Sequence, residues 1–493
     1  MSHPHRPAHR ALFRLRQTVA PVLLLALPLA LGSCAESGPS ILAEVLTRVD
    51  PPLSGTARSV LIISLDTVRA DHLSVYGYER PTSPNLEAFA QVATLYTQAR
   101  AASPWTLPSH ATLFTGIYPF EHGARTYSKP RNVSSTGRQN NAGPLDREFL
   151  TLAELFARNG YRTAGFVAND GFLTSRWAID QGFEEYDATR GYADDVNRRA
   201  FDWLEKIGDE PFFLFLNFMD AHRPYNSSPP EGFTDFGGPE ASAATLKGLY
   251  PEVLGKPGLR PPEMFERLIG QYDNALANLD AGLGQLFDKL RELRIFEDLL
   301  IVITSDHGEY FGEHRLIEHS KDVYEGGLHV PLLIKAPGQA QGRRDDALVS
   351  HAHVPGIIIS YAALSKITKA EAETLTRHWP RMSVIAENYY SRPRDLRAEW
   401  GARFDRVRQV VYDGDYKYID SSDGKSELYD LSSDPEERVN LFARQPDVAA
   451  RMSELLRSQT EATRRSETVE VSEDLTDEEI EALRALGYLD DAG

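Results

Sequence analysis

A series of short, predominantly apolar runs constrains the fold of this chain more than any other feature of its sequence. The runs lie at Val60–Leu65, Thr163–Ala168, Phe212–Met219, Leu299–Thr304 and Val330–Ile334. Aliphatic and β-branched residues without polar alternation are typical of strands buried on both faces of a parallel sheet. Helical patterns such as Phe149–Arg158 and Phe265–Arg294 separate the runs. We therefore predict a doubly wound, mostly parallel α/β sheet whose ligand site lies at the carboxyl ends of the strands.

Side chains that bind metals or transfer protons follow directly after several of these predicted strands. They are Asp66, then Asp220 with His222, then Asp306 with His307. The carboxyl ends of parallel strands meet at one edge of a sheet, so these separate segments reach the same place. Asp66, Asp306 and His307 offer a mixed oxygen and nitrogen set, which suits Mn²⁺, Zn²⁺ or Mg²⁺ better than Ca²⁺. A lone Asp after a strand is often a helix cap, so it is the joint placement that favours one divalent metal site.

The pattern changes beyond about residue 370. Short strands are predicted at 407–412, 416–419 and 427–431, with Asp-Gly turn signals between them, which indicates a small antiparallel sheet. A final helix begins at a capping box formed by Thr476 and Glu479 and ends at Gly487. The segment Tyr225–Met264 is rich in Pro and Gly, and it is interpreted either as a lid over the strand ends or as a spacer.

The N-terminal region has the features of an export signal. Residues 1–16 carry arginines and no acid, and the apolar run Val19–Leu31 is too short to span a bilayer. Leu31-Gly32-Ser33-Cys34 resembles a bacterial lipobox, in which the cysteine is lipidated and becomes the new N-terminus. The alternative is a cleavable signal peptide or an anchor helix with an incidental cysteine. We predict an exported bacterial lipoprotein, anchored in the membrane on the periplasmic or cell-surface side.

The predicted organisation follows from these features. A signal peptide occupies residues 1–33, a tether 34–56, a catalytic domain 57–370 and a C-terminal subdomain 371–493. The single cysteine excludes a disulfide framework and a thiolate zinc cluster.

The charge balance limits the partners of the protein. Lysines and arginines number 53 against 71 aspartates and glutamates, which gives a net charge of −18. A field of that sign disfavours general affinity for nucleic acid or anionic lipid, so we expect membrane contact through the lipid anchor only. An anionic substrate then has to be met by locally placed cations or by a metal.

One segment resembles a known family. Thr106-Leu107-Pro108-Ser109-His110-Ala111-Thr112-Leu113-Phe114-Thr115-Gly116 is similar to the sulfatase signature of the alkaline phosphatase superfamily. The Leu-x-Thr-Gly end fixes the frame and puts Thr106 where the family has its nucleophile. Sulfatases that use formylglycine need Cys or Ser at position 106 and Arg at position 110, whereas this chain has Thr106 and His110. Threonine cannot be oxidised to that aldehyde, so we expect no formylglycine.

The resemblance extends over nearly all of the chain after the tether. Further segments that look like family motifs lie at 65–72, 219–225, 304–309, 321–327 and 427–431. The resemblance implies an alkaline-phosphatase-like sheet followed by a small antiparallel subdomain with a helix. The Asp-His pair at Asp306 and His307 looks like that of phosphonate monoester hydrolases rather than the Asp-Asn pair of arylsulfatases. Thr67 stands where many sulfatases have a second Asp.

The resemblance also implies a mechanism, which we state as a hypothesis. A divalent metal held by Asp66, Asp306 and His307 lowers the pKa of the Thr106 hydroxyl, which joins the metal site and attacks phosphorus or sulfur in line. Superfamily relatives with threonine at this position pass through a phospho-threonine intermediate.

Other residues receive roles by the same resemblance. Lys321 and Asn169 bind the substrate and stabilise the equatorial oxygens of the transition state. His222 holds or protonates the leaving oxygen, and His110 orients Thr106. Each also has a purely structural interpretation: Lys321 pairs with Glu325 on a helix, His222 is a satisfied strand-end histidine, and His110 merely starts a helix.

The sequence also offers candidates for a second metal site. Glu313, His314 and His319 lie close in sequence to the second metal segment and are candidates to bind another ion. Lys321 would then crowd that ion with positive charge, which argues against the arrangement.

These observations lead to a metal-dependent hydrolase of sulfate or phosphate-type esters, with the threonine favouring phosphoester or phosphonate cleavage. The predicted substrate is an anionic small-molecule, glycan or lipid ester. One alternative is a transferase that moves a phosphoryl group onto an envelope acceptor. The other is a binding protein for sulfate or phosphate on an inactive scaffold, but a chain without catalytic demand has no physical need for so dense a cluster of charged side chains.

Overall fold

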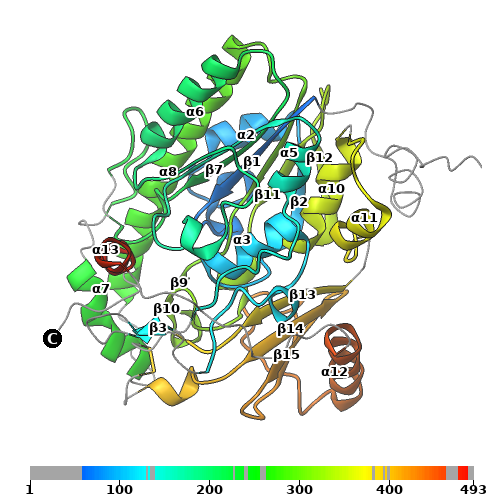
Figure 1. Cartoon of the computed structure of the whole chain (residues 1–493). Helices are drawn as coiled ribbons and strands as arrows, with labels where there is room; N and C mark the ends of the chain where they lie inside the picture. The colour runs from blue at the N-terminus through cyan, green and yellow to red at the C-terminus, as the bar shows by residue number, and fades with distance from the viewer. Residues whose placement is uncertain are drawn as a thin grey trace, which may run out of the picture. The chain divides into compact units, whose positions relative to one another are not determined.

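A large mixed sheet dominates the computed structural model, which describes residues 58–128, 132–133, 139–140, 142–225, 228–237, 243–255, 262–362, 364–379, 383–391, 395–396, 400–461 and 476–486. In this part of the chain the sheet has eight strands in the order β12-β2-β11-β8-β1-β7-β5-β6 (Figure 1). Their bounds are β1 Ser59–Leu65, β2 Thr94–Arg100, β5 Arg162–Val167, β6 Glu185–Ala188, β7 Phe212–Phe218, β8 Leu299–Thr304, β11 Leu332–Lys335 and β12 Arg343–Ser350.

The prediction of a mostly parallel sheet is confirmed. β1 pairs in parallel with β7 on one side and β8 on the other, and β5 continues the parallel set beyond β7. β11 is the exception, because it runs antiparallel to both β8 and β2. Its apolar sequence carries no information about direction, so the run at Val330–Ile334 predicted the strand but not its orientation.

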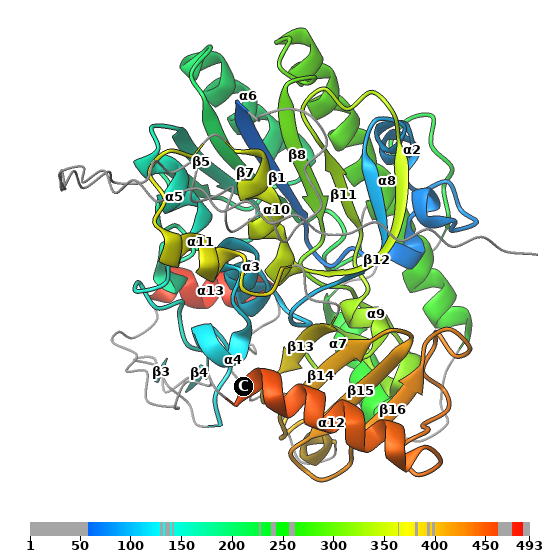
Figure 2. The ribbon, with the colours of Figure 1, turned by 90° about the vertical axis from the view of Figure 1, so that its right-hand side faces the viewer.

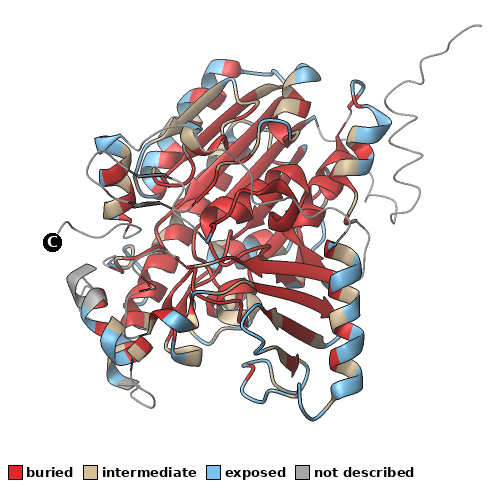
Figure 3. Ribbon diagram, turned by 60° about the horizontal axis from the view of Figure 1, so that its bottom comes forward, coloured by how far each residue is buried: buried red, intermediate tan, exposed pale blue. Residues whose placement is uncertain are grey.

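Helices cover both faces of this sheet. α6 (Ala193–Ile207) and α8 (Pro262–Glu292) lie on one face, and α3 (Thr106–Thr115), α5 (Leu152–Arg158) and α10 (Val354–Tyr361) lie on the other (Figures 1 and 2). The strands between them are buried: every residue of β1, β7 and β8 lies in the core (Figure 3). This explains why the sequences of these strands are apolar on both faces.

A second, antiparallel sheet follows the large one, as predicted. Its order is β13-β14-β15-β16, with bounds β13 Ser383–Asn388, β14 Arg408–Asp413, β15 Tyr416–Ser421 and β16 Glu427–Asp430. α12 (Pro446–Thr460) packs against β14 and β15 (Figure 2). The last described helix, α13 (Asp477–Ala485), begins at the predicted capping box of Thr476 and Glu479.

Short elements connect these parts. They are η1 Ala70–His72, η2 Ser74–Tyr76, α2 Pro84–Ala90, α4 Pro119–His122, β3 Asn132–Val133, β4 Gln139–Asn140, η3 Ser175–Trp177, α7 Ala243–Tyr250, η4 Pro251–Gly255, β9 Tyr310–Phe311, η5 Glu313–Arg315, β10 Ile317–Glu318, α9 Glu325–Leu328, η6 His351–His353, α11 Lys369–Leu375 and η7 Gly401–Arg403. The segment Tyr225–Met264 is therefore not one long loop, since α7 and η4 lie within it.

Some predictions concern residues outside the described ranges. The signal peptide at 1–33, Cys34 and the tether at 34–56 all lie there. Among the described residues, no helix combines the length and the apolar character needed to cross a bilayer.

Candidate active site

The carboxyl ends of β1 and β8 bring the predicted metal ligands together. Asp66 follows β1, and Asp306 and His307 follow β8, its parallel neighbour, in which Thr304 lies opposite Ser64. One ligand atom from each of Asp66, Asp306 and His307 lies within 4.8 Å of the others, and all three residues are buried. The adjacent strands thus form the grouping that the sequence pattern predicted.

The polar atoms of this cluster fit a divalent cation. Asp66 Oδ1 and Asp306 Oδ2 are buried and accept no hydrogen bond from the described residues. Burial raises the pKa of Asp66 to about 8, with the nearby Asp306 adding to the effect, and burial raises the pKa of Asp306 to about 7. Each carboxylate thus keeps one buried oxygen without a donor among the described residues, which is costly, and a bound cation removes that cost.

His307 has the tautomer expected of a metal ligand. Its Nδ1 donates to the carbonyl of Gly308 at 2.9 Å. In the neutral ring Nε2 is then the nitrogen that can bind a cation, and it lies 3.4 Å from Asp306 Oδ2 and 3.4 Å from Thr106 Oγ1.

Thr67 stands where many sulfatases have a second Asp. Instead of offering a carboxylate to a metal, it makes hydrogen bonds to its neighbours. Its hydroxyl donates to the carbonyl of Asp66 at 2.7 Å, and its backbone nitrogen donates to Asp306 Oδ1 at 3.2 Å. The residue has a φ of 62°, in the left-handed region that threonine rarely adopts. The hydroxyl of Tyr272 fixes this conformation by donating to the Thr67 carbonyl at 2.8 Å. Such local strain is typical of functional sites.

Thr106 stands at the first position of α3, fully buried beside the metal cluster. Its Oγ1 atom lies next to His307, and the positive end of the helix dipole favours negative charge on that oxygen. At the other end of α3, Gly116 has a φ of 71° and a Cβ there would lie 3.0 Å from the Leu375 carbonyl oxygen. The glycine of the signature is therefore required by the backbone that ends the helix.

His110 contacts the backbone of Thr106, not its hydroxyl. Nδ1 bonds the Thr106 carbonyl at 2.8 Å, and Nε2 lies 2.8 Å from Ser64 Oγ on β1. Burial lowers the pKa of His110 to about 3, so the ring is neutral. His110 thus ties the start of α3 to the strand that carries Asp66.

Asn169 touches a metal ligand directly. Its Nδ2 donates to Asp66 Oδ2 at 2.9 Å, while its Oδ1 accepts from the backbone nitrogens of Gly171 at 3.2 Å and Phe172 at 2.9 Å. The amide that the resemblance assigned to substrate oxygens therefore orients Asp66 in this structure.

His222 lies in a row of imidazole rings beside the metal cluster. The ring of His319 lies 4.6 Å from that of His307 and 5.2 Å from that of His222. Nδ1 of His222 donates to the Arg223 carbonyl at 2.9 Å, and burial lowers the pKa of His222 to about 3. His319 is oriented by Glu309, whose Oε1 lies 3.1 Å from His319 Nδ1.

Lys321 lies in a buried group of carboxylates. Its Nζ is 3.6 Å from Glu318 Oε2 and 4.0 Å from Asp395 Oδ1, and it donates to the His319 carbonyl at 3.3 Å. The interpretation that Lys321 and Glu325 lie on one helix is wrong for this structure, because α9 begins only at Glu325, which pairs with Arg100 and Lys417.

The second metal site is not formed. Glu313 pairs with Arg69 at 2.8 Å, and the His314 ring stacks on Tyr324 at 3.7 Å. His319 contacts Glu309 through its Nδ1 atom. Among the described residues, the cluster of Asp66, Asp306 and His307 is the single grouping with metal-ligand geometry.

The sequence did not point to His351, which contacts the site through Ser109. Ser109 Oγ donates to the Asp306 carbonyl at 2.5 Å and lies 3.0 Å from His351 Nδ1. His351 follows β12, so it is another strand-end histidine. Because β12 is rich in charged residues, its sequence did not predict a strand, and His351 was not recognised as a strand-end residue.

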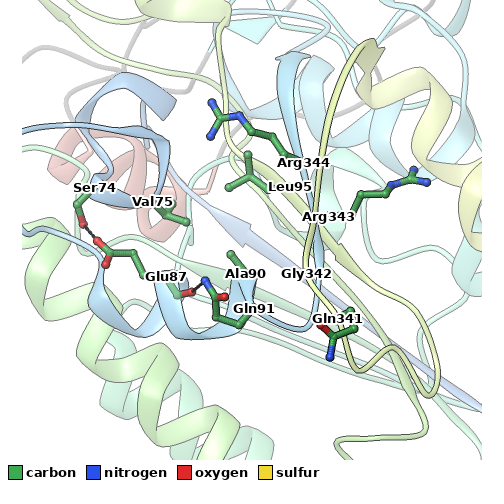
Figure 4. A pocket seen from close by; sticks show the side chains of 10 residues that line it. All are labelled: Ser74, Val75, Glu87, Ala90, Gln91, Leu95, Gln341, Gly342, Arg343 and Arg344. Carbon is green, nitrogen blue, oxygen red and sulfur yellow. Dashed lines mark hydrogen bonds between the residues drawn. The ribbon is translucent and has the colours of Figure 1, made fainter.

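A separate pocket of about 490 Å³ lies among α2, β2 and the start of β12 (Figure 4). Ser74, Glu87, Gln341 and Arg344 are among its lining residues, and Glu87 bonds to Ser74 there. It contains none of the predicted site residues.

Comparisons with known proteins agree with this geometry. The sulfatase family model matches residues 58–362. Arylsulfatase K of Gallus gallus is 23% identical over 485 residues, covering 85% of each chain. The ulvan-active sulfatase of Formosa agariphila is 26% identical over 467 residues, covering 88% of this chain and 84% of that protein.

Solved structures share the fold. Phosphonate monoester hydrolase of Agrobacterium radiobacter superposes with a TM-score of 0.60 at 23% identity, covering 82% of this chain and 96% of that one. The putative sulfatase YidJ of Bacteroides fragilis superposes with a TM-score of 0.61 at 18% identity, covering 84% and 97%. Since the family model spans more than half of the sequence and its strand-end residues meet at one site, the chain belongs to the sulfatase family and is a hydrolase of sulfuric or phosphoric esters.

Proposed function

We propose that this protein is a metal-dependent hydrolase that uses Thr106 as its nucleophile and cleaves phosphoric or phosphonic esters. The observation that carries the proposal is the Thr106 hydroxyl at the start of α3, 3.4 Å from His307 in the metal cluster. This residue cannot become formylglycine, so the hydrated aldehyde of other sulfatases has no counterpart here.

Asp66, Asp306 and His307 are the residues that would hold the ion. When bound, a divalent cation supplies positive charge that polarises an anionic ester and favours loss of a proton from a nearby hydroxyl. Asn169 keeps Asp66 oriented through its amide, and His110 holds the backbone of Thr106 against β1.

Thr106 carries the covalent chemistry in this proposal. Its oxygen gives its proton to water, forms a bond to phosphorus and displaces the leaving oxygen, which takes up a proton from water. Water then cleaves the resulting phospho-threonine, which releases the phosphate or phosphonate and regenerates the hydroxyl. His222 is neutral and donates its Nδ1 proton to the Arg223 carbonyl, so its Nε2 is an acceptor. We propose that His222 binds a hydroxyl of substrate or water rather than protonating the leaving group.

Turnover by the form that starts after Cys34 tests this proposal. The assay compares p-nitrophenyl phosphate, bis-p-nitrophenyl phosphate, a phenylphosphonate ester and p-nitrophenyl sulfate with Mn²⁺ or Zn²⁺ added. We expect phosphoester or phosphonate turnover, reduced on the order of 10³-fold or more in Thr106→Ala and largely kept in Thr106→Ser. Sulfate turnover that survives Thr106→Ala would contradict the proposal, because it requires another nucleophile.

The class of leaving group is proposed from the relatives. The ulvan-active sulfatase and a structure solved with D-glucosamine-2-N,6-O-disulfate indicate glycan esters as substrates of related proteins. We propose an anionic ester of a glycan, lipid or small molecule as the substrate of this protein.

Lipidation of Cys34 is part of the same proposal, since a lipid anchor would hold the site at a membrane surface. The basic N-terminal residues and the short apolar run before Cys34 support it. Full-length protein made in a bacterium is expected in the membrane fraction, and Cys34→Ala is expected in the soluble fraction. Equal distribution of the two proteins would contradict the anchor.

A further inference from the structure

The last described helix packs its apolar side against the protein. Ile480 and Leu483 on α13 and Leu486 at its end are 4%, 1% and 3% exposed. A Cβ added to Gly171 would lie 2.5 Å from Leu486 Cδ1 and 3.4 Å from Leu483 Cδ2. The two leucines therefore cover Gly171, in the loop that follows β5.

Arginines from separate segments also bind α13. Arg176 pairs with Glu479 at 3.0 Å. Arg190 donates to the Ala482 carbonyl at 3.1 Å while pairing with Asp170 at 2.6 Å.

Arg223 is the third arginine that contacts the α13 segment. Its guanidinium donates to the Leu486 carbonyl at 2.8 Å. Together with Arg190, it puts a cation at the C-terminal carbonyls of the helix, where the dipole is negative.

Two of the residues that α13 contacts, Gly171 and Arg223, belong to segments that carry site residues. Asn169 accepts hydrogen bonds from Gly171 and Phe172, and through its Nδ2 it holds Asp66. A continuous chain of contacts thus runs from the α13 leucines through Gly171 and Asn169 to a metal ligand.

A second chain of contacts runs through Arg223. The Arg223 carbonyl accepts the Nδ1 proton of His222, and its guanidinium lies 3.2 Å from Glu318 Oε1. Glu318 is also a neighbour of Lys321. One side chain therefore joins the end of α13 to the segments of His222 and Lys321.

We propose that α13 is a positioning element of the active site, which holds the Asn169 loop and the His222 segment in the arrangement that metal and substrate binding require. The proposal rests on the proposed function for the identity of the site. It predicts that the site loosens when α13 is detached, because the helix acts on the metal ligands through Gly171, Asn169 and Arg223.

The test removes the docking contacts in the full-length protein by the double substitution Leu483→Ala and Leu486→Ala. Mn²⁺ binding is measured by calorimetry, and hydrogen exchange is followed at residues 169–176 and 222–225. We expect Mn²⁺ affinity to fall by about tenfold or more, as when supporting residues of metal ligands are lost. Exchange at the two loops should accelerate, while exchange at β1 and β8 stays unchanged.

Two further variants separate positioning from stability. Gly171→Ala presses on the leucines without changing the sequence of α13, because its Cβ would lie 2.5 Å from Leu486 Cδ1 but only in ordinary contact, at 3.5 Å, with Asn169 Oδ1. The φ of Gly171 lies outside the left-handed region, so the variant should reproduce the loss of affinity. The matched control, Met452→Ala with Leu456→Ala on α12, removes comparable buried side chains away from the site. It should lower the melting temperature without changing Mn²⁺ affinity.

The outcomes of the α13 test are distinct from those of the Thr106→Ala test, because Mn²⁺ binding does not require Thr106 to react. Unchanged affinity with α13 exposed to exchange would overturn the positioning role. Increased turnover in the leucine variant would also overturn it, by showing that the helix blocks the site. Failure of Thr106→Ala to abolish turnover would contradict only the proposed nucleophile.

Discussion

Asn169 is the residue whose role differs most from what the resemblance implied. Its amide donates to Asp66 Oδ2, which leaves Oδ1 as the oxygen of that carboxylate without a donor among the described residues. A side chain that fixes the orientation of a ligand typically changes metal affinity when it is removed.

We expect Asn169→Ala to weaken Mn²⁺ binding by about 10- to 100-fold. Asn159→Ala serves as the control, because that amide bonds the Leu155 carbonyl at the end of α5. Calorimetric titration of both variants checks the expectation, and equal affinities would contradict it.

The pKa values of the two carboxylates predict how metal binding depends on pH. Burial raises the pKa of Asp66 to about 8 and that of Asp306 to about 7, from an ordinary value of 3.8. In the metal-free protein these groups stabilise the fold below their unfolded pKa, and that contribution is lost as pH rises through 7 to 8.

A cation competes with those protons, so its stabilising effect is expected to grow as pH rises. The shift in melting temperature on adding Mn²⁺ should be larger at about pH 8.5 than at about pH 6. Scanning calorimetry with and without Mn²⁺ measures it, and a shift that is independent of pH would contradict the assignment of these ligands.

At the scale of elements, α3 depends on the glycine that ends it. Gly116 and Gly414 have φ values of 71° and 59°, but only the Cβ built at Gly116 meets another group, the Leu375 carbonyl oxygen at 3.0 Å. Alanine substitutions at these two glycines therefore separate the cost of a left-handed backbone from the cost of a steric collision.

Gly414→Ala is expected to lower the free energy of unfolding by about 1 to 2 kcal/mol, the cost of a left-handed alanine. Gly116→Ala should cost at least about 1 kcal/mol more, because the added methyl group overpacks its site. Urea unfolding measures both, and equal losses would show that the Leu375 contact carries no cost.

Strands that are apolar on both faces were predictable, and strands with mixed surfaces were not. β1, β7 and β8 are buried throughout, so their sequences are mostly apolar on both faces. β12 is exposed over much of its length, and its charged sequence resembles that of a loop. The sequence therefore predicted neither this strand nor the position of His351 at its end. The direction of β11 depends on its neighbours in the sheet rather than on its own residues.

The site was predictable to the extent that strand ends determine it. Asp66 and Asp306 meet because parallel strands end at one edge. The partners of Lys321 and Asn169 depend on side chains from segments far apart in sequence, and no spacing rule gives those contacts. Thr106 was found through a motif, and its distance from His307 required the structure.

At the scale of the whole molecule, buried ion pairs join the C-terminal sheet to the catalytic part. Lys417 on β15 is fully buried and pairs with Glu325 at 3.0 Å and Glu437 at 2.6 Å. Glu325 begins α9, four residues after Lys321. The second sheet therefore supports the segment that carries Lys321.

Lys417→Met leaves these carboxylates without that cation, and we expect it to reduce the free energy of unfolding by about 3 to 5 kcal/mol. Lys425→Met, which removes an exposed partner of Asp423, should change it by less than about 1 kcal/mol. Chemical denaturation of both variants checks this, and similar small effects would show that the buried pairs contribute little.

The central position of β1 has a consequence for the order of events during synthesis. Its strand partners are β7, where Val60 lies opposite Phe213, and β8, where Val60 lies opposite Leu300. The first strand of the described chain therefore emerges from the ribosome long before either neighbour exists. Contacts so distant in sequence make folding slow. The nascent chain must reach beyond β8 before this part of the sheet can close, and until then an apolar strand lacks both of its partners.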